Sequence, residues 1–388
     1  MTDGATLAAE SPSGLSRASS TIGWGLFCAS SWTWCIGMFL PLILLEIFGW
    51  SAFWYFAVPN VIGCAAMGYI LTAQRSRQFV DAHARPMRLF SFATVLYQVF
   101  FIGYASSTFL FTEGTLAVDR WPVLGTVLTL AAAAYAISRR GDLFWRIFAL
   151  IATIAAVILF WVTIDFTGGF PSAPSPQGAP SALAAAPLFA IGFLLCPYLD
   201  PTFHRARQQA PSRHAFLIFG LVFAFMLAFA AASYDSRAFG TVLIWAVFTQ
   251  WMIQLVFTIG AHMREINELP HAFIGANLMC LAAVVLGAIA GLPDIADERI
   301  YLSLLGLYAL PFPLYVLAAM VAGPMRRLPR GASVAILLLS LALAPFAWIG
   351  FVGRTTPALL VVFAGVLVGG IAIGLISRRW TASIASAR

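Results

Sequence analysis

The chain is built from long apolar stretches joined by short polar ones. Twelve apolar windows of about 18–25 residues are each long enough to cross the roughly 30 Å hydrocarbon core of a bilayer as a helix. None shows the strict alternation of apolar and polar residues found in membrane-spanning strands. The pattern therefore predicts an all-α polytopic membrane protein. Its windows are residues 21–46, 51–73, 88–112, 121–138, 143–164, 183–200, 214–234, 239–262, 271–292, 300–322, 333–353 and 357–377.

Composition excludes a soluble globular protein and sets the topology. Hydrophobic residues make up 61% of the 388 residues, charged residues only 10%, and the mean hydropathy is +0.90. All 22 basic residues are arginines, spread over short loops, which argues against nucleic-acid binding. With a cytoplasmic amino terminus, 18 of the 22 lie on the cytoplasmic side, as the positive-inside rule requires. We therefore expect an integral protein of a bacterial-type inner membrane with both termini in the cytoplasm. The four external arginines are Arg120, Arg237, Arg299 and Arg354.

The windows divide the chain into two halves and a carboxy-terminal pair. Residues 1–20 are small and polar and predict a disordered cytoplasmic tail. Residues 165–182 hold four prolines and three glycines, and they predict an external connector between the five-helix repeats 21–164 and 183–322. The two last helices and a tail occupy residues 323–388.

Two windows are irregular and point to function. The first contains FCASSWTWCIGMFLP, a mid-membrane cluster of small hydroxyl residues, and the sixth contains PLFAIGFLLCPYLDP. Pro197 must interrupt the hydrogen-bond ladder near Cys196–Tyr198. A broken helix is tolerated in a membrane only against protein or a water-filled cavity. Since five helices per half invert the second half relative to the first, paired breaks in windows one and six predict a midplane binding site of a secondary transporter. The alternative is that the prolines and serines only kink ordinary helices.

The same residues resemble a known family. The run SSWTWCIGMFLPLILLEIFGWSAFW is similar to the first core helix of the sodium/solute symporter family, which often has the residues Ile36, Gly37 and Met38 at this place. The stretch CPYLDPTFHRARQQAPSRHAF resembles that family's sixth core helix, with His204 and Arg205 in place of a Gln-Arg pair. The resemblance implies a LeuT-type five-plus-five inverted repeat followed by two carboxy-terminal helices.

The resemblance also implies a set of site residues. A sodium ion, the one possible cofactor, would bind the backbone carbonyls of Phe27 and Ser30 and the hydroxyl of Thr258. Ile259 stands where the family has a second hydroxyl, so the site lacks one of the oxygens a hard cation needs. We therefore expect weak or absent sodium dependence. The implied substrate contacts are Ser31, Trp34, Cys35, Tyr97, Gln98, Cys196, Tyr198, Gln250 and Gln254.

Charged residues fall near the window ends, and an acidic relay for proton pumping is not expected there. Interfacial solvation is their ordinary role, but Asp200 follows the Pro197 break at the predicted cytoplasmic mouth, and with Pro197 it is a candidate gating residue. His262, Glu265, Glu268 and His271 recur every three residues, yet Pro270 ends the helix and Arg264 repels a cation, so a cytoplasmic loop is favoured over a metal site.

The chemistry of the sequence favours transport over catalysis. It has no serine nucleophile elbow, phosphate-binding glycine loop or zincin motif, and its five cysteines show no disulfide or zinc spacing. We expect a transporter that moves a small neutral or zwitterionic organic solute by alternating access, with helices one, two, six and seven moving as a unit. The alternatives are a solute sensor or scaffold of the same fold, and a membrane transferase built on the His262–His271 cluster. Besides the solute and the bilayer no partner is implied, and the oligomeric state is open.

The arginine count makes a direct prediction about topology. A reporter fused after Arg388 and one inserted near Gln177 should report opposite compartments, because an odd number of spans separates the two positions in this count. Paired alkaline phosphatase and green fluorescent protein fusions measure this. Both reporters in one compartment would contradict the count of twelve helices.

Overall fold

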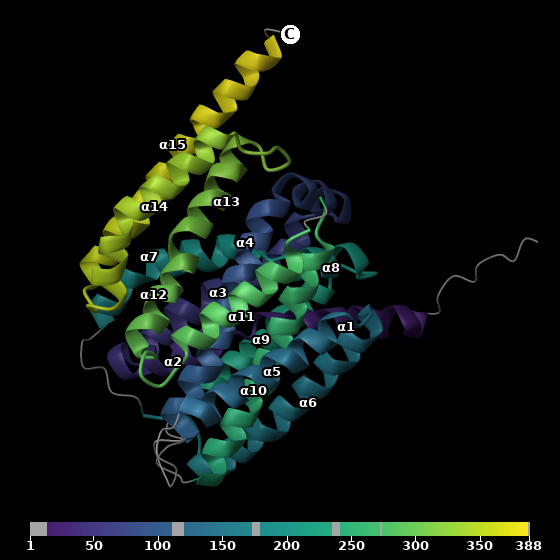
Figure 1. The fold of residues 1–388 in the computed structure, drawn as a ribbon, viewed down its shortest axis with the longest axis vertical. Helices are drawn as coiled ribbons and strands as arrows, with labels where there is room; N and C mark the ends of the chain where they lie inside the picture. The colour runs from purple at the N-terminus through teal and green to yellow at the C-terminus, as the bar shows by residue number, and fades with distance from the viewer. Residues whose placement is uncertain (1–13, 111–119, 173–178, 235–240, 272–273, 387–388) are drawn as a thin grey trace, which may run out of the picture.

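The structure, a computed structural model, describes residues 14–110, 120–172, 179–234, 241–271 and 274–386 (Figure 1). All regular elements in these ranges are helical, as predicted. Within these ranges ten helical segments, some of them made of two consecutive elements, are long and apolar enough to span a membrane, and the bent pair α1 and α2 makes an eleventh. The helices are α1 (Gly14–Trp32), α2 (Cys35–Phe48), α3 (Trp50–Ile70), α4 (Ala73–Ala105), η1 (Ser106–Leu110), α5 (Arg120–Ser138), α6 (Asp142–Thr167), α7 (Ala179–Leu195), η2 (Cys196–Leu199), α8 (Pro201–Gln209), α9 (Ala215–Ala232), α10 (Thr241–Glu268), α11 (Ala276–Ala290), α12 (Glu298–Ala309), α13 (Pro311–Ala322), α14 (Arg330–Phe351) and α15 (Thr356–Ser386).

The first window is broken where the sequence predicts a break. Helices α1 and α2 meet at an angle of 58°, and Thr33 and Trp34 belong to neither. The Thr33 hydroxyl donates to the carbonyl of Ala29 at 2.7 Å, and the indole N–H of Trp34 donates to the carbonyl of Ser31. The backbone N–H of Thr33 also donates to Ala29, whereas the Ser31 carbonyl has lost its usual donor, the N–H of Cys35, and the Trp34 side chain replaces it, as a membrane interior requires.

The sixth window is also broken, at the predicted prolines. Helix α7 ends at Leu195, a single 3₁₀ turn covers Cys196–Leu199, and α8 begins at Pro201. Proline is well tolerated at the first helical position because its missing N–H would have no partner there. Asp200 caps α8, since its carboxylate accepts from the backbone N–H of Thr202 at 2.8 Å.

The helices form two groups that meet at these breaks. Helices α1, α2, α3, α7 and α9 pack on one another, and α4, α5, α10 and α11 form a second group. Helix α6 contacts both groups, and the antiparallel pair α14 and α15 lies along one edge of the molecule (Figure 1). The fourth helix in this order, α4, is the most enclosed span, with 83% of its apolar window buried. Long buried helices thus surround both interruptions.

Helix boundaries differ from the prediction at four places. Helix α1 begins at Gly14, so residues 14–20 are helical and not a disordered tail; Arg146 of α6 holds them, donating to the Ser20 hydroxyl at 2.8 Å and stacking over Trp24. Helix α10 continues to Glu268 through the predicted cytoplasmic loop. The connector is shorter than expected, because α6 ends at Thr167 and α7 begins at Ala179.

Helix α4 likewise begins 15 residues before its apolar window, at Ala73. Thr72 caps it by accepting from the N–H of Arg75, and a kink at His83 precedes Pro86. Helix α11 has 15 residues, about 22 Å, and is shorter than the bilayer core.

Glycines allow α4 and α11 to approach closely. A Cβ atom on Gly103 would lie 2.3 Å from the carbonyl oxygen of Gly291, and one on Gly287 would lie 2.6 Å from the carbonyl oxygen of Leu96. Small residues at such crossings let backbones touch, which stabilises helix pairs in membranes.

Gly103→Ala should therefore lower the free energy of unfolding by about 1–3 kcal/mol, because the two backbones must separate. Gly125→Ala is the matched control, since a Cβ there meets no atom within 4 Å. Thermal unfolding in detergent compares them. Equal melting temperatures would show that this contact does not limit the packing.

Candidate functional site

The two helix breaks lie against each other in the interior. The hydroxyl of Ser31, at the end of α1, is 3.0 Å from the hydroxyl of Thr202, at the start of α8. Both side chains are buried. The structure thus brings together the irregular parts of windows one and six, which lie 171 residues apart in the chain.

A small cavity lies between the breaks. Its volume is about 10 Å³, roughly the limit for one water molecule. The lining is aromatic and uncharged, and includes residues from both broken helices. It consists of Trp32, Trp34, Ile36, Gly37, Asn60, Phe193, Cys196, Phe223 and Tyr308.

Aromatic rings enclose Trp34, one of the predicted substrate contacts. Its ring centroid lies 4.4 Å from that of Trp32, 5.1 Å from Tyr308 and 5.4 Å from Phe90. The indole N–H of Trp32 donates to the side-chain oxygen of Asn60 at 2.8 Å, which fixes α1 to α3.

Helix α10 carries a stripe of buried polar residues, which we call the α10 stripe: Gln250, Gln254, Thr258 and His262, each four residues after the last. The side-chain amides of Gln250 and Gln254 have no hydrogen-bond partner among the described residues. Because a buried amide without a partner costs about 1–3 kcal/mol, this part of the stripe suits a polar ligand or water.

Two of the predicted sodium ligands are in contact. The hydroxyl of Thr258 lies 3.3 Å from the carbonyl oxygen of Ser30, so these two converge. The ring of Phe27 packs against Phe257 and Trp145, and Ile259, at the position of the missing hydroxyl, is fully buried.

Tyr97 and Gln98 position α2, the second half of the broken first helix, through hydrogen bonds. The side-chain oxygen of Gln98 accepts from the backbone N–H of Cys35 at 3.0 Å, at the start of α2. The Tyr97 hydroxyl donates to the carbonyl of Tyr301, and the Tyr301 hydroxyl donates to the carbonyl of Cys35. These contacts place α2 against α4 and α12. The amide nitrogen of Gln98 is buried without a partner in the described part of the chain.

The other predicted contacts divide between the cavity and its surroundings. Cys196 lines the cavity, and its thiol lies 3.2 Å from the carbonyl oxygen of Tyr308. Tyr198 does not line it: the carbonyl of Tyr198 accepts from His204, and its ring faces Phe79. Pro197 lies in the 3₁₀ turn between α7 and α8.

Asp200 is buried and does not lie at an open mouth. Its side chain is 0% exposed, one oxygen accepts from the Thr202 hydroxyl at 2.6 Å, and the other is 3.7 Å from Nε2 of His262. The sequence prediction of solvated charges at window ends was wrong here, because the 3₁₀ turn ends the apolar helix inside the protein.

A network of ion pairs closes the side predicted to be cytoplasmic; we call it the cytoplasmic network. Arg205 of α8 pairs with Glu265 and with Glu268 at 2.6 Å, and Arg264 pairs with Asp142 of α6 at 2.6 Å and with Glu268 at 3.0 Å. Burial lowers the pKa of Arg205, but the two glutamates raise it further, so the net shift is upward and the guanidinium stays charged.

These pairs also separate the residues of the suspected metal cluster. Glu265 and Glu268 face arginines, His262 faces the Ser91 hydroxyl at 3.0 Å, and His271, beyond the end of α10, contacts Arg327. Within the described ranges, no group of three or more histidine, cysteine or acidic side chains is placed to hold a metal ion.

An aromatic cluster closes the opposite side; we call it the aromatic plug. The ring of Phe39 in α2 lies 5.1 Å from Tyr301, 5.5 Å from Phe101, 5.7 Å from Tyr104 and 6.0 Å from Trp251. The plug joins α2 to α4, α10 and α12. Neither the plug nor the cytoplasmic network lines the central cavity, whose walls belong to the two broken helices and their neighbours.

Several residues of the site escape sequence reasoning. Trp32, Asn60 and Tyr308 line the cavity, yet isolated aromatic and amide residues are common in membrane helices and signal nothing alone. Asp142 and Arg205 carry a weak signal, since each lies just beyond an apolar window in a predicted cytoplasmic loop.

Comparison with known proteins shows the fold. No family model and no characterised protein matches the sequence. The inward-facing structure of Mhp1 covers 94% of this chain and 91% of its own, with a TM-score of 0.54 and 13% identity. The substrate-bound, outward-open structure of a Na⁺-coupled sialic acid symporter covers 93% and 91%, with a TM-score of 0.53 and 12% identity. This chain is therefore an all-α membrane protein of LeuT-type fold, and the fold prediction is confirmed.

The sodium prediction follows from Thr258 and Ile259. The unmodified protein should show little stabilisation by sodium over a large organic cation, and Ile259→Ser should increase it, because a ligand bound only by the folded state raises apparent stability. Thermal shifts in the two salts measure this. A strong sodium response in the unmodified protein that Thr258→Ala abolishes would contradict the expectation.

The cytoplasmic network predicts a change in accessibility. Arg205→Gln removes the cation that α8 contributes between Glu265 and Glu268, so repulsion between the two carboxylates should open this side. Buried thiols such as Cys28 should then react with N-ethylmaleimide about tenfold faster. A tenfold change corresponds to roughly 1.4 kcal/mol in the opening equilibrium. Arg354→Gln, which breaks an exposed pair with Glu298, is the control. Equal rates in both variants would show that other contacts hold this side closed.

Proposed function

We propose that this protein is a secondary transporter for a small neutral or zwitterionic organic solute, working by alternating access. The observation that carries the proposal is the meeting of two discontinuous helices at one closed, aromatic cavity. Transporters of this fold bind their substrates near the midplane at such breaks. The LeuT-type fold supports the same assignment.

The chemistry of the cavity sets the class of solute. Its lining carries no charged side chain, so a solute with net charge would enter without a counterion. Each break presents a helix C-terminus, of α1 and of α7, and a helix N-terminus, of α2 and of α8. Helix ends carry partial charges of about half a unit, positive at the N-terminus and negative at the C-terminus. A zwitterion or a polar neutral molecule matches such paired ends.

The two closed ends supply the gates. The cytoplasmic network joins α8 to α10 and α6, and the aromatic plug joins α2 to α4, α10 and α12. In both, one half of a broken helix, α8 or α2, contacts helices outside the first group. Motion of α1, α2, α3, α7, α8 and α9 against the rest would break one set of contacts while the other stays formed, and this is alternating access.

The proposal is tested by uptake into proteoliposomes. A panel of radiolabelled amino acids, nucleobases, betaines and sugars should contain at least one solute that accumulates, and excess unlabelled solute should abolish accumulation. No uptake of any solute, together with no stabilising ligand in a thermal-shift screen, would favour a sensor or scaffold.

Pro197→Ala should restore a backbone donor in the 3₁₀ turn and favour a continuous helix, so uptake should fall at least tenfold while membrane insertion is unchanged. Pro345→Ala is the control, because Pro345 lies in α14, away from both breaks. Uptake is measured at equal amounts of reconstituted protein. If the two variants transport equally, Pro197 is an ordinary kink.

A further inference from the structure

A chain of buried polar side chains links four helices next to the cavity. The Ser31 hydroxyl of α1 contacts the Thr202 hydroxyl of α8, which donates to Asp200. Asp200 faces His262 of α10, and Nδ1 of His262 is 3.0 Å from the Ser91 hydroxyl of α4. The chain is continuous except between Asp200 and His262.

That one gap joins two unpartnered atoms. Oδ2 of Asp200 and Nε2 of His262 have no hydrogen-bond partner in the described part of the chain, and they are 3.7 Å apart. A hydrogen bond between nitrogen and oxygen needs about 2.7–3.2 Å. Both side chains are 0% exposed, so an ionised carboxylate here without a facing proton would be costly.

The groups packed around the pair supply no free cation. Arg205, on the same helix as Thr202, is engaged by Glu265 and Glu268, and His204 accepts from or donates to Ser76 and donates to the carbonyl of Tyr198. The remaining titratable groups near Asp200 are thiols, a phenol and a carboxylate on the neighbouring helices. They are Cys28 of α1, Cys64 of α3, Tyr308 of α12 and Glu265 of α10.

We propose that Asp200 and His262 share one transported proton, which is the coupling ion of this protein. The inference rests on the proposed transport function and names its ion. With the proton present, the pair is neutral overall, as carboxylic acid and imidazole or as carboxylate and imidazolium, and a shift of less than about 1 Å makes a hydrogen bond across the gap. Without it, the buried pair carries one negative charge.

The position of the pair turns protonation into motion. Asp200 caps α8 and follows directly on the turn that ends α7, a helix of the first group, whereas His262 lies on α10, in the second. The protonated pair holds the two groups together, whereas the deprotonated pair favours an opening that brings water to Asp200. Sodium does not suit this place, since one of the two facing atoms is an imidazole nitrogen and hard cations prefer oxygen ligands.

The test is a pH step on proteoliposomes adsorbed to a solid-supported membrane, without sodium and without added solute. The unmodified protein should give a transient charge displacement. Asp200→Asn and His262→Gln should each reduce it at least tenfold, and Asp165→Asn, at an exposed carboxylate near the end of α6, should leave it unchanged. Monodisperse size-exclusion profiles establish that each variant is folded.

The outcomes separate this proposal from the proposed function. A displacement that persists in both Asp200→Asn and His262→Gln, or that appears only with sodium, overturns the proton site. Solute uptake that is unaffected by an imposed pH gradient also overturns it and leaves transport standing. The charge displacement can also be lost in both variants while the unmodified protein takes up no solute. That outcome supports the proton site and contradicts solute transport.

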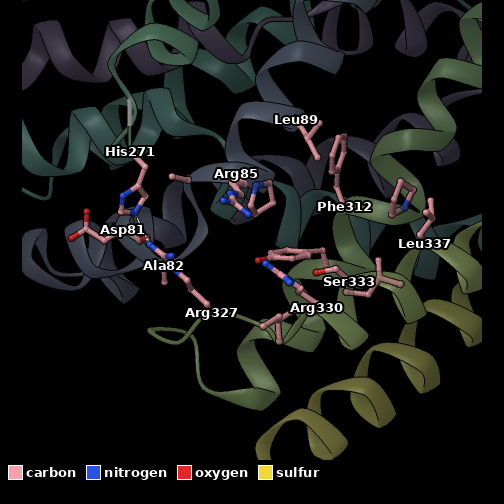
Figure 2. Close-up of a pocket in the computed structure, with 16 residues that line it drawn as sticks. Asp81, Ala82, Arg85, Leu89, His271, Phe312, Arg327, Arg330, Ser333 and Leu337 are labelled. Atoms are coloured by element: carbon pink, nitrogen blue, oxygen red, sulfur yellow. Dashed lines mark hydrogen bonds between the residues drawn. The ribbon is translucent and has the colours of Figure 1, made fainter. Parts of the chain in front are cut away.

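A second, independent observation concerns a pocket on the lateral surface of the protein. A pocket of about 560 Å³ lies between the first part of α4 and the helices α13 and α14 (Figure 2). Its apolar part includes Leu89 and Leu337, both more than half exposed and so facing lipid. Three arginines, Arg85, Arg327 and Arg330, line the rest, and all three belong to the side predicted to be cytoplasmic.

Charge and shape together indicate the ligand. Arg85 and Arg330 form no ion pair with any residue in the described ranges, and Figure 2 shows the Asp81 carboxylate at the edge of the pocket, pointing away from them. Arg327 donates to the backbone carbonyl of Asp81 at 3.2 Å. We infer that the pocket binds an anionic phospholipid of the adjoining leaflet, with its phosphate at the arginines and its acyl chains along Leu89 and Leu337.

Native mass spectrometry tests the lipid site. The protein is released from phosphatidylcholine nanodiscs in which one fifth of the lipid is phosphatidylglycerol. The unmodified protein should retain phosphatidylglycerol, the double variant Arg85→Gln/Arg330→Gln should lose at least three quarters of it, and Arg378→Gln/Arg379→Gln, at the end of α15, should not. Equal retention by both double variants overturns the inference. Displacement of the lipid by millimolar inorganic phosphate would also overturn it, because the site would then be one for free phosphate.

Discussion

The structure depends on the requirement that every buried backbone group in a membrane find a hydrogen-bond partner. Two broken helices in the interior would each leave several N–H and C=O groups without partners. Side chains replace the lost ladder: Trp34 donates to the carbonyl of Ser31 in α1, Gln98 accepts from the first N–H of α2, and Asp200 accepts at the start of α8. The breaks are therefore stable features built by specific residues. The cavity lies where these residues meet.

The cytoplasmic network and the aromatic plug are held together by different forces. The cytoplasmic network consists of five charged side chains on three helices, whose attraction weakens as salt screens it. The aromatic plug depends on burial and ring packing, which salt hardly affects. The two clusters therefore respond to different conditions: added salt weakens the cytoplasmic network and leaves the aromatic plug nearly unchanged.

Much of the fold follows from the sequence, because apolar length and proline position are local signals. The windows, both breaks and the connector between halves come from such signals, and the comparisons confirm the fold. Contacts between distant segments leave no local trace. Arg146 extends α1 to Gly14, Glu265 pairs with Arg205 across 60 residues, and the burial of Asp200 results from a turn whose depth no window reveals. Of the candidate site, the broken helices were predictable and the groups that close them were not.

The regular spacing of the α10 stripe has a geometric consequence for the neighbours that its side chains face. Residues four apart on an α-helix are rotated by about 40° relative to each other, since each residue advances about 100°. From Gln250 to His262 the polar side chains thus turn through about 120° while rising about 18 Å, more than half of the roughly 30 Å hydrocarbon thickness. The stripe is a spiral and not a straight wall. Its residues therefore face different neighbours: the Thr258 hydroxyl lies 3.3 Å from the carbonyl oxygen of Ser30 in α1, whereas His262 faces Asp200 at the start of α8 and Ser91 of α4.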